Sequence, residues 1–318
     1  MKKRILASTA LIPTAGAAAA GLVFFHKVFD RIDGVWGIDK EGRAPEDDQY
    51  LPFRPQYEEA KRYIHTLPYE EVTITSFDGL KLYARYYPNP NAKRAVLCAH
   101  GYRSTAIGDF YASFRHLYEE ASLLLIDERS CGKSEGIYSS FGALEKKDVQ
   151  LWAEWLDERT RHKLPLYLYG ISMGAATVLL ASVMKLPENV KGILADCGFT
   201  SGAQILNDVF ADSYKIKPRL MTKLLDFYAG SLGHFHLKDC DARRALLNAK
   251  LPVRFMHGMD DDFVLPYHTQ RNYDACSLED KDILWVEGAG HACAAVCGGE
   301  KYLKYMDAFF AEREADAQ

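Results

Sequence analysis

The chain has 318 residues, 48% hydrophobic and 26% charged, which suffices for one large domain with a substantial core and excludes a disordered protein. Its formal net charge is −4, so we expect no general attraction to phosphate backbones. The sequence has no zinc-finger spacing and no basic stripe interleaved with aromatic residues, and we therefore expect no nucleic acid partner.

The N-terminal segment has the features of an export or anchoring element. Lys2, Lys3 and Arg4 precede an uncharged stretch, residues 5–25, that is long enough to cross a hydrocarbon core. We interpret residues 1–30 as a signal anchor or signal peptide, and the apolar residues that continue past the small residues at 17–20 favour the uncleaved anchor. The cationic start is expected to stay cytoplasmic, which places residues 31–318 outside the cell membrane, or secreted after cleavage. An apolar helix packed on the domain is the alternative, but it leaves the Lys-Lys-Arg start unexplained.

A polar, proline-containing segment covers residues 39–68 and is followed by short apolar runs that read as strands. Residues 72–76 and 82–87 form a predicted hairpin around an Asp78-Gly79 turn. Six further runs are nearly continuous in apolar residues, which is typical of parallel strands buried on both faces. These runs are RAVLCAHG (94–101), SLLLIDER (122–129), LPLYLYG (164–170), VKGILADCG (190–198), PVRFMHG (252–258) and KDILWVEGAGH (281–291).

Amphipathic stretches alternate with these strands. Residues 144–159 and 300–313 have apolar residues at helical spacing, which predicts a doubly wound α/β domain with a mostly parallel sheet of about eight strands. Between about 201 and 240 there is no strand-like run, and apolar residues recur as in two helices. We interpret this insertion as a helical cap over the carboxyl ends of the strands, where such sheets bind ligands. An ordinary crossover with an extra helix is the alternative.

Seven cysteines are scattered along the chain and odd in number, so they do not form a disulfide framework. We expect buried thiols, with a Cys293–Cys297 disulfide as an alternative. A zinc site at His291 with these two cysteines lacks a second paired motif, and a calcium site at Asp260 to Asp262 lacks further spaced oxygen ligands. We expect no metal and no cofactor.

The pentapeptide Gly170-Ile171-Ser172-Met173-Gly174 matches the pattern G-x-S-x-G. A predicted strand runs directly into Ser172 and helix-forming residues follow it, which is the strand-to-helix turn of a nucleophile elbow. The two glycines are needed because the turn is strained and a Cβ at either position would collide with neighbouring strands. The turn predicts Ser172 as a catalytic nucleophile, with a serine in an ordinary turn as the alternative.

A serine hydroxyl needs a base and a third group that orients the base. In this architecture the order along the chain is serine, acid, histidine. Asp260, Asp261 and Asp262 follow one predicted strand, and His291 follows the last strand after Gly288 and Gly290. His100 is a rival base, and Asp196 is a rival acid.

These residues resemble the α/β-hydrolase superfamily, and more narrowly the bacterial membrane-anchored hydrolases of the serine aminopeptidase and monoacylglycerol lipase type. The resemblance covers about residues 72–310 and depends on these motifs: 100–102 (HGY), 127–136 (DERSCGKSEG), 170–174 (GISMG), 258–264 (GMDDDFV) and 290–291 (GH). It implies Asp261 as the acid, an oxyanion hole from the backbone N–H groups of Tyr102 and Met173, and a structural His100. The family often has Arg-Gly-His-Gly where this chain has Arg129-Ser130-Cys131-Gly132, which affects local packing rather than the chemistry.

The sequence therefore predicts a serine hydrolase that cleaves carboxylic esters through an acyl-enzyme formed on Ser172, with His291 as base and Asp261 as acid. The expected substrate is a small ester or amide with an apolar group. An aminopeptidase or amide hydrolase would use the same triad and would need an anionic subsite, for which Glu128, Glu135 and the cap aspartates are candidates. A non-catalytic surface binding protein on a hydrolase fold is the alternative of another class.

Overall fold

The computed structural model describes residues 16, 18–31, 49–211 and 218–315, so the predicted anchor lies partly outside the described residues. The described helices and strands, in chain order after a helix at residues 18–29, are η1 (Leu51–Phe53), α2 (Arg54–Thr66), β1 (Glu70–Thr75), β2 (Lys81–Tyr87), β3 (Arg94–Ala99), α3 (Ala106–Glu120), β4 (Ala121–Asp127), α4 (Glu145–Arg159), β5 (Leu166–Ile171), α5 (Met173–Ala181), β6 (Val190–Asp196), α6 (Gly202–Val209), α7 (Pro218–Tyr228), η3 (Ala229–Gly233), η4 (Leu237–Asp239), α8 (Ala242–Leu246), β7 (Val253–Gly258), α9 (Tyr267–Ala275), β8 (Lys281–Val286) and α10 (Ala294–Ala315).

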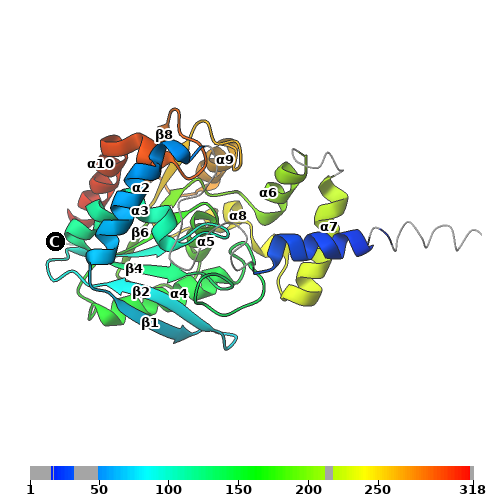
Figure 1. The fold of residues 1–318 in the computed structure, drawn as a ribbon, viewed down its shortest axis with the longest axis horizontal. Helices are drawn as coiled ribbons and strands as arrows, with labels where there is room; N and C mark the ends of the chain where they lie inside the picture. The colour runs from blue at the N-terminus through cyan, green and yellow to red at the C-terminus, as the bar shows by residue number, and fades with distance from the viewer. Residues whose placement is uncertain (1–15, 17, 32–48, 212–217, 316–318) are drawn as a thin grey trace, which may run out of the picture.

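The centre of the molecule is one eight-stranded sheet in the order β1-β2-β4-β3-β5-β6-β7-β8 (Figure 1). The pairs from β4 to β8 are parallel, whereas β2 is antiparallel to both β1 and β4. The predicted hairpin and the six further predicted strands are all present, with β8 at one edge of the sheet. Because the parallel strands run in one direction, the loops after β3, β5, β6, β7 and β8 meet at one edge of the sheet.

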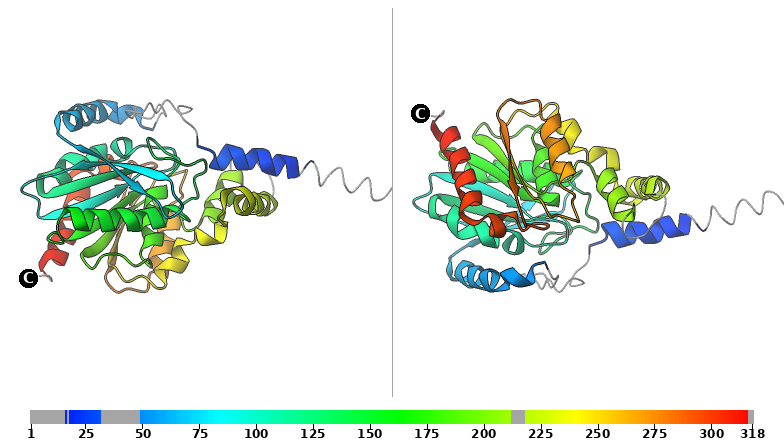
Figure 2. Two further views of the ribbon diagram at one scale, coloured as in Figure 1. Left: turned by 90° about the horizontal axis from the view of Figure 1, so that it is seen from below. Right: turned by 90° about the horizontal axis from the view of Figure 1, so that it is seen from above.

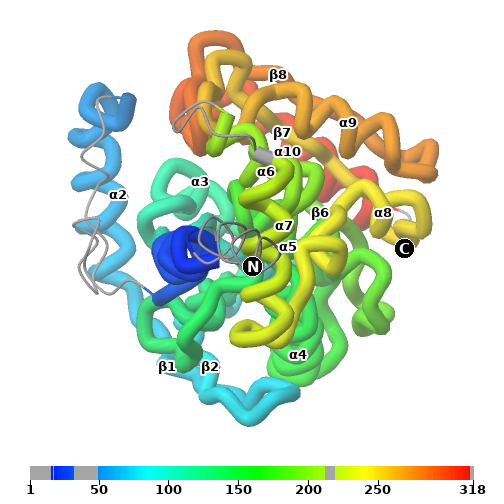
Figure 3. Tube along the Cα trace, turned by 90° about the vertical axis from the view of Figure 1, so that its right-hand side faces the viewer, coloured from blue at the N-terminus to red at the C-terminus, as the bar shows by residue number. Residues whose placement is uncertain are grey.

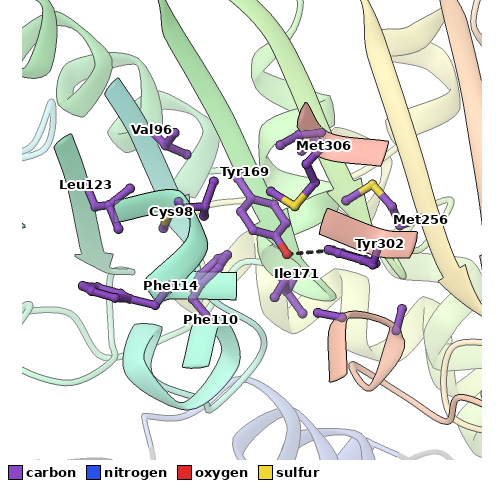
Figure 4. Close-up of a cluster of buried hydrophobic side chains, with 14 of the residues drawn as sticks. Val96, Cys98, Phe110, Phe114, Leu123, Tyr169, Ile171, Met256, Tyr302 and Met306 are labelled. Carbon is purple, nitrogen blue, oxygen red and sulfur yellow. Dashed lines mark hydrogen bonds between the residues drawn. The ribbon is translucent and has the colours of Figure 1, made fainter. Parts of the chain in front are cut away.

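Helices cover both faces of the sheet. On one face, α3 and α10 pack on side chains such as Val96 and Tyr169, and the Tyr169 and Tyr302 hydroxyls lie 2.7 Å apart within this core (Figure 4). On the other face, α4, α5 and α8 bury Trp152, Leu179 and Leu246 against the alternate residues of the same strands. Burial on both faces explains why these strands are continuous apolar runs.

Helix α2 lies in the segment that the sequence did not predict to be helical. Pro55 is at the start of the helix, where its missing N–H costs no hydrogen bond. Tyr57 and Ile64 are buried two turns apart, and the ring of Tyr57 meets that of Tyr111 on α3 at 5.2 Å. A charged helix with so narrow an apolar stripe gives a weak sequence signal.

The predicted cap consists of α6, α7, η3 and η4, and the N-terminal helix of residues 18–29 packs beside it (Figures 2 and 3). Phe25 and Phe29 have no exposed surface, and the Tyr228 hydroxyl on α7 donates to the Ala18 carbonyl at 2.9 Å. No helix within the described ranges is long and apolar enough to cross a membrane. Hence residues 18–30, which we interpreted from the sequence as part of a signal anchor or signal peptide, contact the domain directly, as in the alternative of a packed helix.

The seven cysteines are free thiols. Six are buried and Cys297 is partly exposed. Cys293 and Cys297 lie four residues apart at the start of α10, where the Cys297 N–H donates to the Cys293 carbonyl, and they do not form the disulfide that the sequence left open.

Candidate active site

Ser172 occupies the turn between β5 and α5. It has φ +56° and ψ −115°, a conformation that non-glycine residues rarely adopt and that stores strain at functional sites. Its N–H donates to the Asp196 carbonyl at the end of β6 at 2.8 Å, which holds the turn against the next strand. The strained turn places the hydroxyl beside the N-terminus of α5, where the helix dipole favours negative charge.

The glycines around Ser172 allow a close approach of backbones. A Cβ on Gly174 would lie 1.9 Å from the Ala99 carbonyl oxygen at the end of β3, and a Cβ on Gly170 would lie 2.2 Å from the Gly174 carbonyl oxygen. Both contacts are shorter than any real Cβ contact. The collision with a neighbouring strand that the sequence predicted is therefore confirmed at Gly174. At Gly170 the prediction was wrong about the partner, because the nearest atoms belong to the turn and the start of α5.

The predicted serine, histidine and acid lie together at the carboxyl edge of the sheet. The Ser172 Oγ is 2.9 Å from His291 Nε2, and His291 Nδ1 is 2.8 Å from Asp261 Oδ2. The other carboxylate oxygen of Asp261 accepts the N–H groups of Phe263 and Val264 at 3.0 and 2.8 Å. All three side chains are nearly buried, so the chain of hydrogen bonds runs through a site with little water.

The charges of the acid and the base stabilise each other. Burial alone would raise the pKa of Asp261, but His291 and His257 outweigh it and hold the pKa of this carboxyl well below its usual range. Burial alone would lower the pKa of His291, but the Asp261 carboxylate outweighs it and raises the pKa of this imidazole. The arrangement therefore favours an imidazolium beside a carboxylate, the charge state that a base has after it takes a proton.

His257, at the end of β7, is a second imidazole on the same carboxylate and was not singled out in the sequence. Its Nε2 lies 3.1 Å from Asp261 Oδ2 and 2.8 Å from the Val264 carbonyl, and both of these oxygens only accept. Nε2 therefore carries the proton. In the neutral ring, Nδ1 then accepts from the Thr269 hydroxyl at 2.5 Å. The side chain has no exposed surface.

The loop after β3 lies beside Ser172. A Cβ on Gly101 would lie 3.2 Å from the Cβ of Ser172, so the next amide, that of Tyr102, is beside the elbow. Asp109 on α3 accepts the Gly101 N–H at 2.5 Å. This hydrogen bond holds the peptide group between His100 and Gly101, one residue before the Tyr102 amide. Within the described chain, neither the Tyr102 nor the Met173 amide donates to a protein acceptor. Both amides are thus available to a ligand oxygen.

Other residues named from the sequence lie outside this constellation. His100 is fully buried, with Nδ1 donating to the Gly101 carbonyl and Nε2 accepting the Glu128 N–H, so it supports the loop. Asp260 and Asp262 are exposed on either side of Asp261. Asp196 accepts the Tyr302 hydroxyl at 2.8 Å, whereas His291 Nδ1 is paired with Asp261.

The carboxylates proposed for an amine subsite differ in their surroundings. Both oxygens of Glu128 are buried without a hydrogen-bond partner, and burial, together with Glu145 and Asp148, raises the pKa of this carboxyl well above its usual value, which favours its neutral form. Glu135 accepts the Lys81 N–H at 2.8 Å. In the cap, Asp208 bonds the side chains of Tyr267 and His268, which join α6 to α9. Asp109 also lies near the elbow, but its carboxyl oxygens already accept the Gly101 N–H and the Ser104 hydroxyl.

Two residues near His291 had no sequence signal. Tyr50, from the segment before η1, donates its hydroxyl to the His291 carbonyl at 3.0 Å and so holds the loop that carries the base. The ring of Phe263 meets the His291 ring at 5.0 Å in an edge-to-face contact and is 45% exposed. Both contacts join segments that are far apart in the sequence, which no local pattern reveals.

The described part of the chain has one cluster with metal-ligand geometry, formed by Cys197, Asp261 and His291, whose ligand atoms lie within 4.8 Å of one another. Burial raises the pKa of the Cys197 thiol well above its usual value, so the thiolate that binds metals is disfavoured. The nitrogens of His291 face Ser172 and Asp261. The cluster is therefore better explained by hydrogen bonding than by a bound ion.

No protein-family model matches the chain. It is 23% identical to the uncharacterized protein YqkD of Bacillus subtilis over 311 residues, which cover 97% of each chain. It is 27% identical to the uncharacterized membrane protein YNL320W of Saccharomyces cerevisiae over 224 residues, 68% of this chain and 71% of the yeast protein.

Solved structures with the same fold include hydrolases. The esterase Pf2001 of Pyrococcus furiosus superposes with a TM-score of 0.64 and 20% identity, covering 79% of this chain and 95% of the esterase. The α/β hydrolase GrgF of Penicillium superposes with a TM-score of 0.58 and 16% identity, covering 78% of this chain and 100% of GrgF. The chain has the α/β-hydrolase fold, as its sequence motifs predicted.

Proposed function

We propose that the protein is a serine hydrolase that cleaves carboxylic esters through an acyl-enzyme intermediate. One observation carries the proposal: a strained Ser172 whose hydroxyl meets His291, which in turn meets the buried Asp261. The fold is shared with solved esterases, and this adds weight without assigning a substrate.

In the proposed reaction, Ser172 Oγ attacks the ester carbonyl while His291 Nε2 takes the hydroxyl proton. The carbonyl oxygen becomes an oxyanion and accepts the Met173 and Tyr102 N–H groups, each of which typically lowers the barrier by about 2.7 to 4 kcal/mol. His291 then gives its proton to the leaving alcohol, and the acyl group stays on Ser172. A water molecule repeats the sequence, with His291 again as base, and releases the acid.

Esters are favoured over peptides with a free amine. An amine needs an ionised carboxylate near the nucleophile. Burial favours the neutral form of Glu128, and Glu135 and Asp208, a cap aspartate among the described residues, have other partners. The cluster beside the elbow is instead apolar. The backbone strain at Ser172 costs stability and persists only where other interactions maintain it. A binding protein without catalysis would have no need of this strain or of the complete triad.

The test uses the full chain, an active-site-directed fluorophosphonate and p-nitrophenyl esters. Wild type should be labelled and should hydrolyse the esters, and Ser172→Ala should lose both activities while its melting temperature stays close to that of wild type. The matched control is Ser182→Ala, which removes another buried serine hydroxyl at the end of the same helix and should keep both activities. Equal labelling of wild type and Ser172→Ala, or no labelling of folded wild type, would refute the proposal.

We also propose that the N-terminal segment holds the protein at the cell membrane with the hydrolase domain on the outer side. The support is the cationic start, Lys2 to Arg4, and the uncharged residues between it and the helix of residues 18–29, since that helix itself packs on the domain. One relative is described as a membrane protein. Fractionation of cells that express the full chain, with protease treatment of intact spheroplasts, tests it. Recovery in the soluble cytosol, or protection of the domain from protease, would contradict it.

A further inference from the structure

The two amides proposed to bind the oxyanion are held in different ways. Met173 is the first residue of α5, and the first N–H groups of a helix have no partner within it, so the helix itself directs this amide outward. Tyr102 lies between β3 and α3, where neither a strand nor a helix fixes the backbone. The direction of the Tyr102 N–H therefore depends on contacts within this loop.

Residues 101–104 form a tight turn around Tyr102 and Arg103. The Ser104 N–H closes the turn on the Gly101 carbonyl at 3.2 Å, and His100 Nδ1 donates to the same carbonyl at 2.8 Å. Arg103 has φ +56°, a region that favours glycine, so the turn is strained. Because a peptide group is planar and trans, the Tyr102 N–H points away from the oxygen that these two donors hold.

Asp109 completes this arrangement from the first turn of α3, where the helix dipole favours a carboxylate. One carboxyl oxygen accepts the Gly101 N–H at 2.5 Å, and the other accepts the Ser104 hydroxyl. Asp109, Gly101 and Ser104 are thus joined in a closed ring of three hydrogen bonds. Tyr102 lies between the two residues that Asp109 binds.

Gly101 is the reason that the turn needs this support. A Cβ at this position would lie 3.1 Å from Asp109 Oδ2 and 3.2 Å from the Ser172 Cβ, so a side chain would crowd the nucleophile. Glycine avoids the contact, but it also rotates more freely about its backbone bonds than any other residue. Rotation at Gly101 would move the adjacent Tyr102 N–H, and a displacement of about 1 Å in a reacting site can cost about a hundredfold in rate.

The side chains at the centre of the turn have separate anchors. The Tyr102 hydroxyl donates to the Val28 carbonyl at 2.5 Å, and the Arg103 guanidinium donates to the Lys27 carbonyl at 2.8 Å, both at the end of the N-terminal helix. These contacts do not involve Asp109. Its removal should therefore loosen the backbone of the turn without detaching the loop from the domain.

We propose that Asp109 is a positioning residue of the reaction, which holds the turn of residues 101–104 so that the Tyr102 N–H meets the oxyanion. This inference rests on the proposed ester hydrolysis. Asp109 acts through Gly101 and Ser104, not on the substrate. An interaction that is made only in the transition state lowers kcat and leaves KM nearly unchanged when it is lost.

The experiment measures kcat and KM of the full chain on p-nitrophenyl butyrate. Asp109→Ala should lose about a hundredfold in kcat at nearly constant KM. Asp109→Asn should restore kcat, because its amide oxygen can accept the Gly101 N–H while its amide nitrogen donates to the Ser104 hydroxyl. The matched control is Ser113→Ala, which removes a buried hydroxyl that bonds the Phe110 carbonyl on the same helix and should keep both constants.

A transition-state analogue gives a readout that a purely structural role would not move. Ser172 Oγ adds to the carbonyl of a trifluoromethyl ketone, its proton passes to His291, and the ketone oxygen becomes an oxyanion with no group leaving. The inhibition constant should rise in Asp109→Ala by the factor by which kcat/KM falls, and it should stay at the wild-type value in Asp109→Asn. Ser104→Ala opens the same ring, so the double variant with Asp109→Ala should lose less than the product of the two single losses.

Melting temperatures of the same samples separate a misplaced amide from a damaged fold. Wild-type kcat and inhibition constant in folded Asp109→Ala would overturn the inference and leave ester hydrolysis standing, and so would an equal loss in Asp109→Asn, because the hydrogen bonds would then not be the cause. If Asp109→Ala does not fold, unchanged kcat in folded Ser104→Ala would overturn it. If wild type hydrolyses no ester and is not labelled by fluorophosphonate, the proposed function fails and the inference fails with it.

Discussion

Substitution of His257 by leucine tests whether the second imidazole on Asp261 acts in the reaction. The carboxylate accepts four hydrogen bonds: one from His291, one from His257 and two from backbone N–H groups. A hydrogen bond to a charged group contributes about 1.5 to 3 kcal/mol. His257 shares its proton with the Val264 carbonyl, so we take the lower value, which corresponds to a loss of about tenfold in kcat.

The substitution also changes the pH dependence. With one donor fewer, the Asp261 carboxylate is a stronger base and holds a protonated His291 more tightly, so the pKa of His291 rises further. Activity is lost when His291 is protonated, because it then accepts no proton from Ser172. The acid limb of kcat/KM against pH should therefore move to higher pH in His257→Leu.

The assay is ester hydrolysis by the full chain across the pH range, with melting temperatures of the same samples. His257→Gln is the matched control, because its amide N–H can replace Nε2–H and should restore both kcat and the acid limb. His257→Leu also leaves the buried Thr269 hydroxyl without its partner, which should cost about 1 to 3 kcal/mol of stability. A lower melting temperature with unchanged kcat and acid limb would refute the reasoning and leave His257 a purely structural residue.

The remaining predictions concern the residues around the elbow. Burial raises the pKa of Asp196 to about 6, above its value in the unfolded chain. The protonated carboxyl therefore stabilises the folded protein below about pH 4, and this contribution is lost as the pH rises through 6. The melting temperature of Asp196→Asn relative to wild type should therefore increase between about pH 4 and pH 7, and a constant difference would contradict this. Gly174→Ala should prevent soluble folding, because its Cβ would lie 1.9 Å from a β3 carbonyl, and normal melting would contradict it. Gly101→Ala, whose Cβ would crowd Ser172 at 3.2 Å, should reduce kcat more than stability, as ester assays and melting curves of the same protein would show.

Much of the candidate site was predictable because its signals are local. The elbow is a strand, a G-x-S-x-G turn and a helix in direct succession, and each is visible in a short window. The loops that carry Asp261 and His291 follow predicted parallel strands, whose carboxyl ends must meet at one edge of the sheet. The meeting of Ser172, Asp261 and His291 therefore followed from topology, although the 2.8 and 2.9 Å contacts needed the structure.

Other parts of the site depend on contacts between distant segments. His257 is in a predicted strand, and nothing in its neighbourhood distinguishes a histidine that bonds the acid from one that fills the core. Asp109 fixes the loop after β3 from within a helix, and Tyr50 reaches the His291 loop from a segment with no predicted element. Each of these contacts exists only because the sheet brings its loops to one edge.

The sequence by itself determined the order of the strands along the chain, the elbow and the triad candidates, because backbone periodicity and turn chemistry act over a few residues. The tertiary structure decided what the apolar N-terminal segment contacts. Apolar residues leave water equally well for lipid or for protein, so the stretch that includes Phe25 has the same pattern in either case. In the structure Phe25 and Phe29 are buried against the cap and the loops beside Ser172, because those loops expose an aromatic surface that only the complete fold assembles.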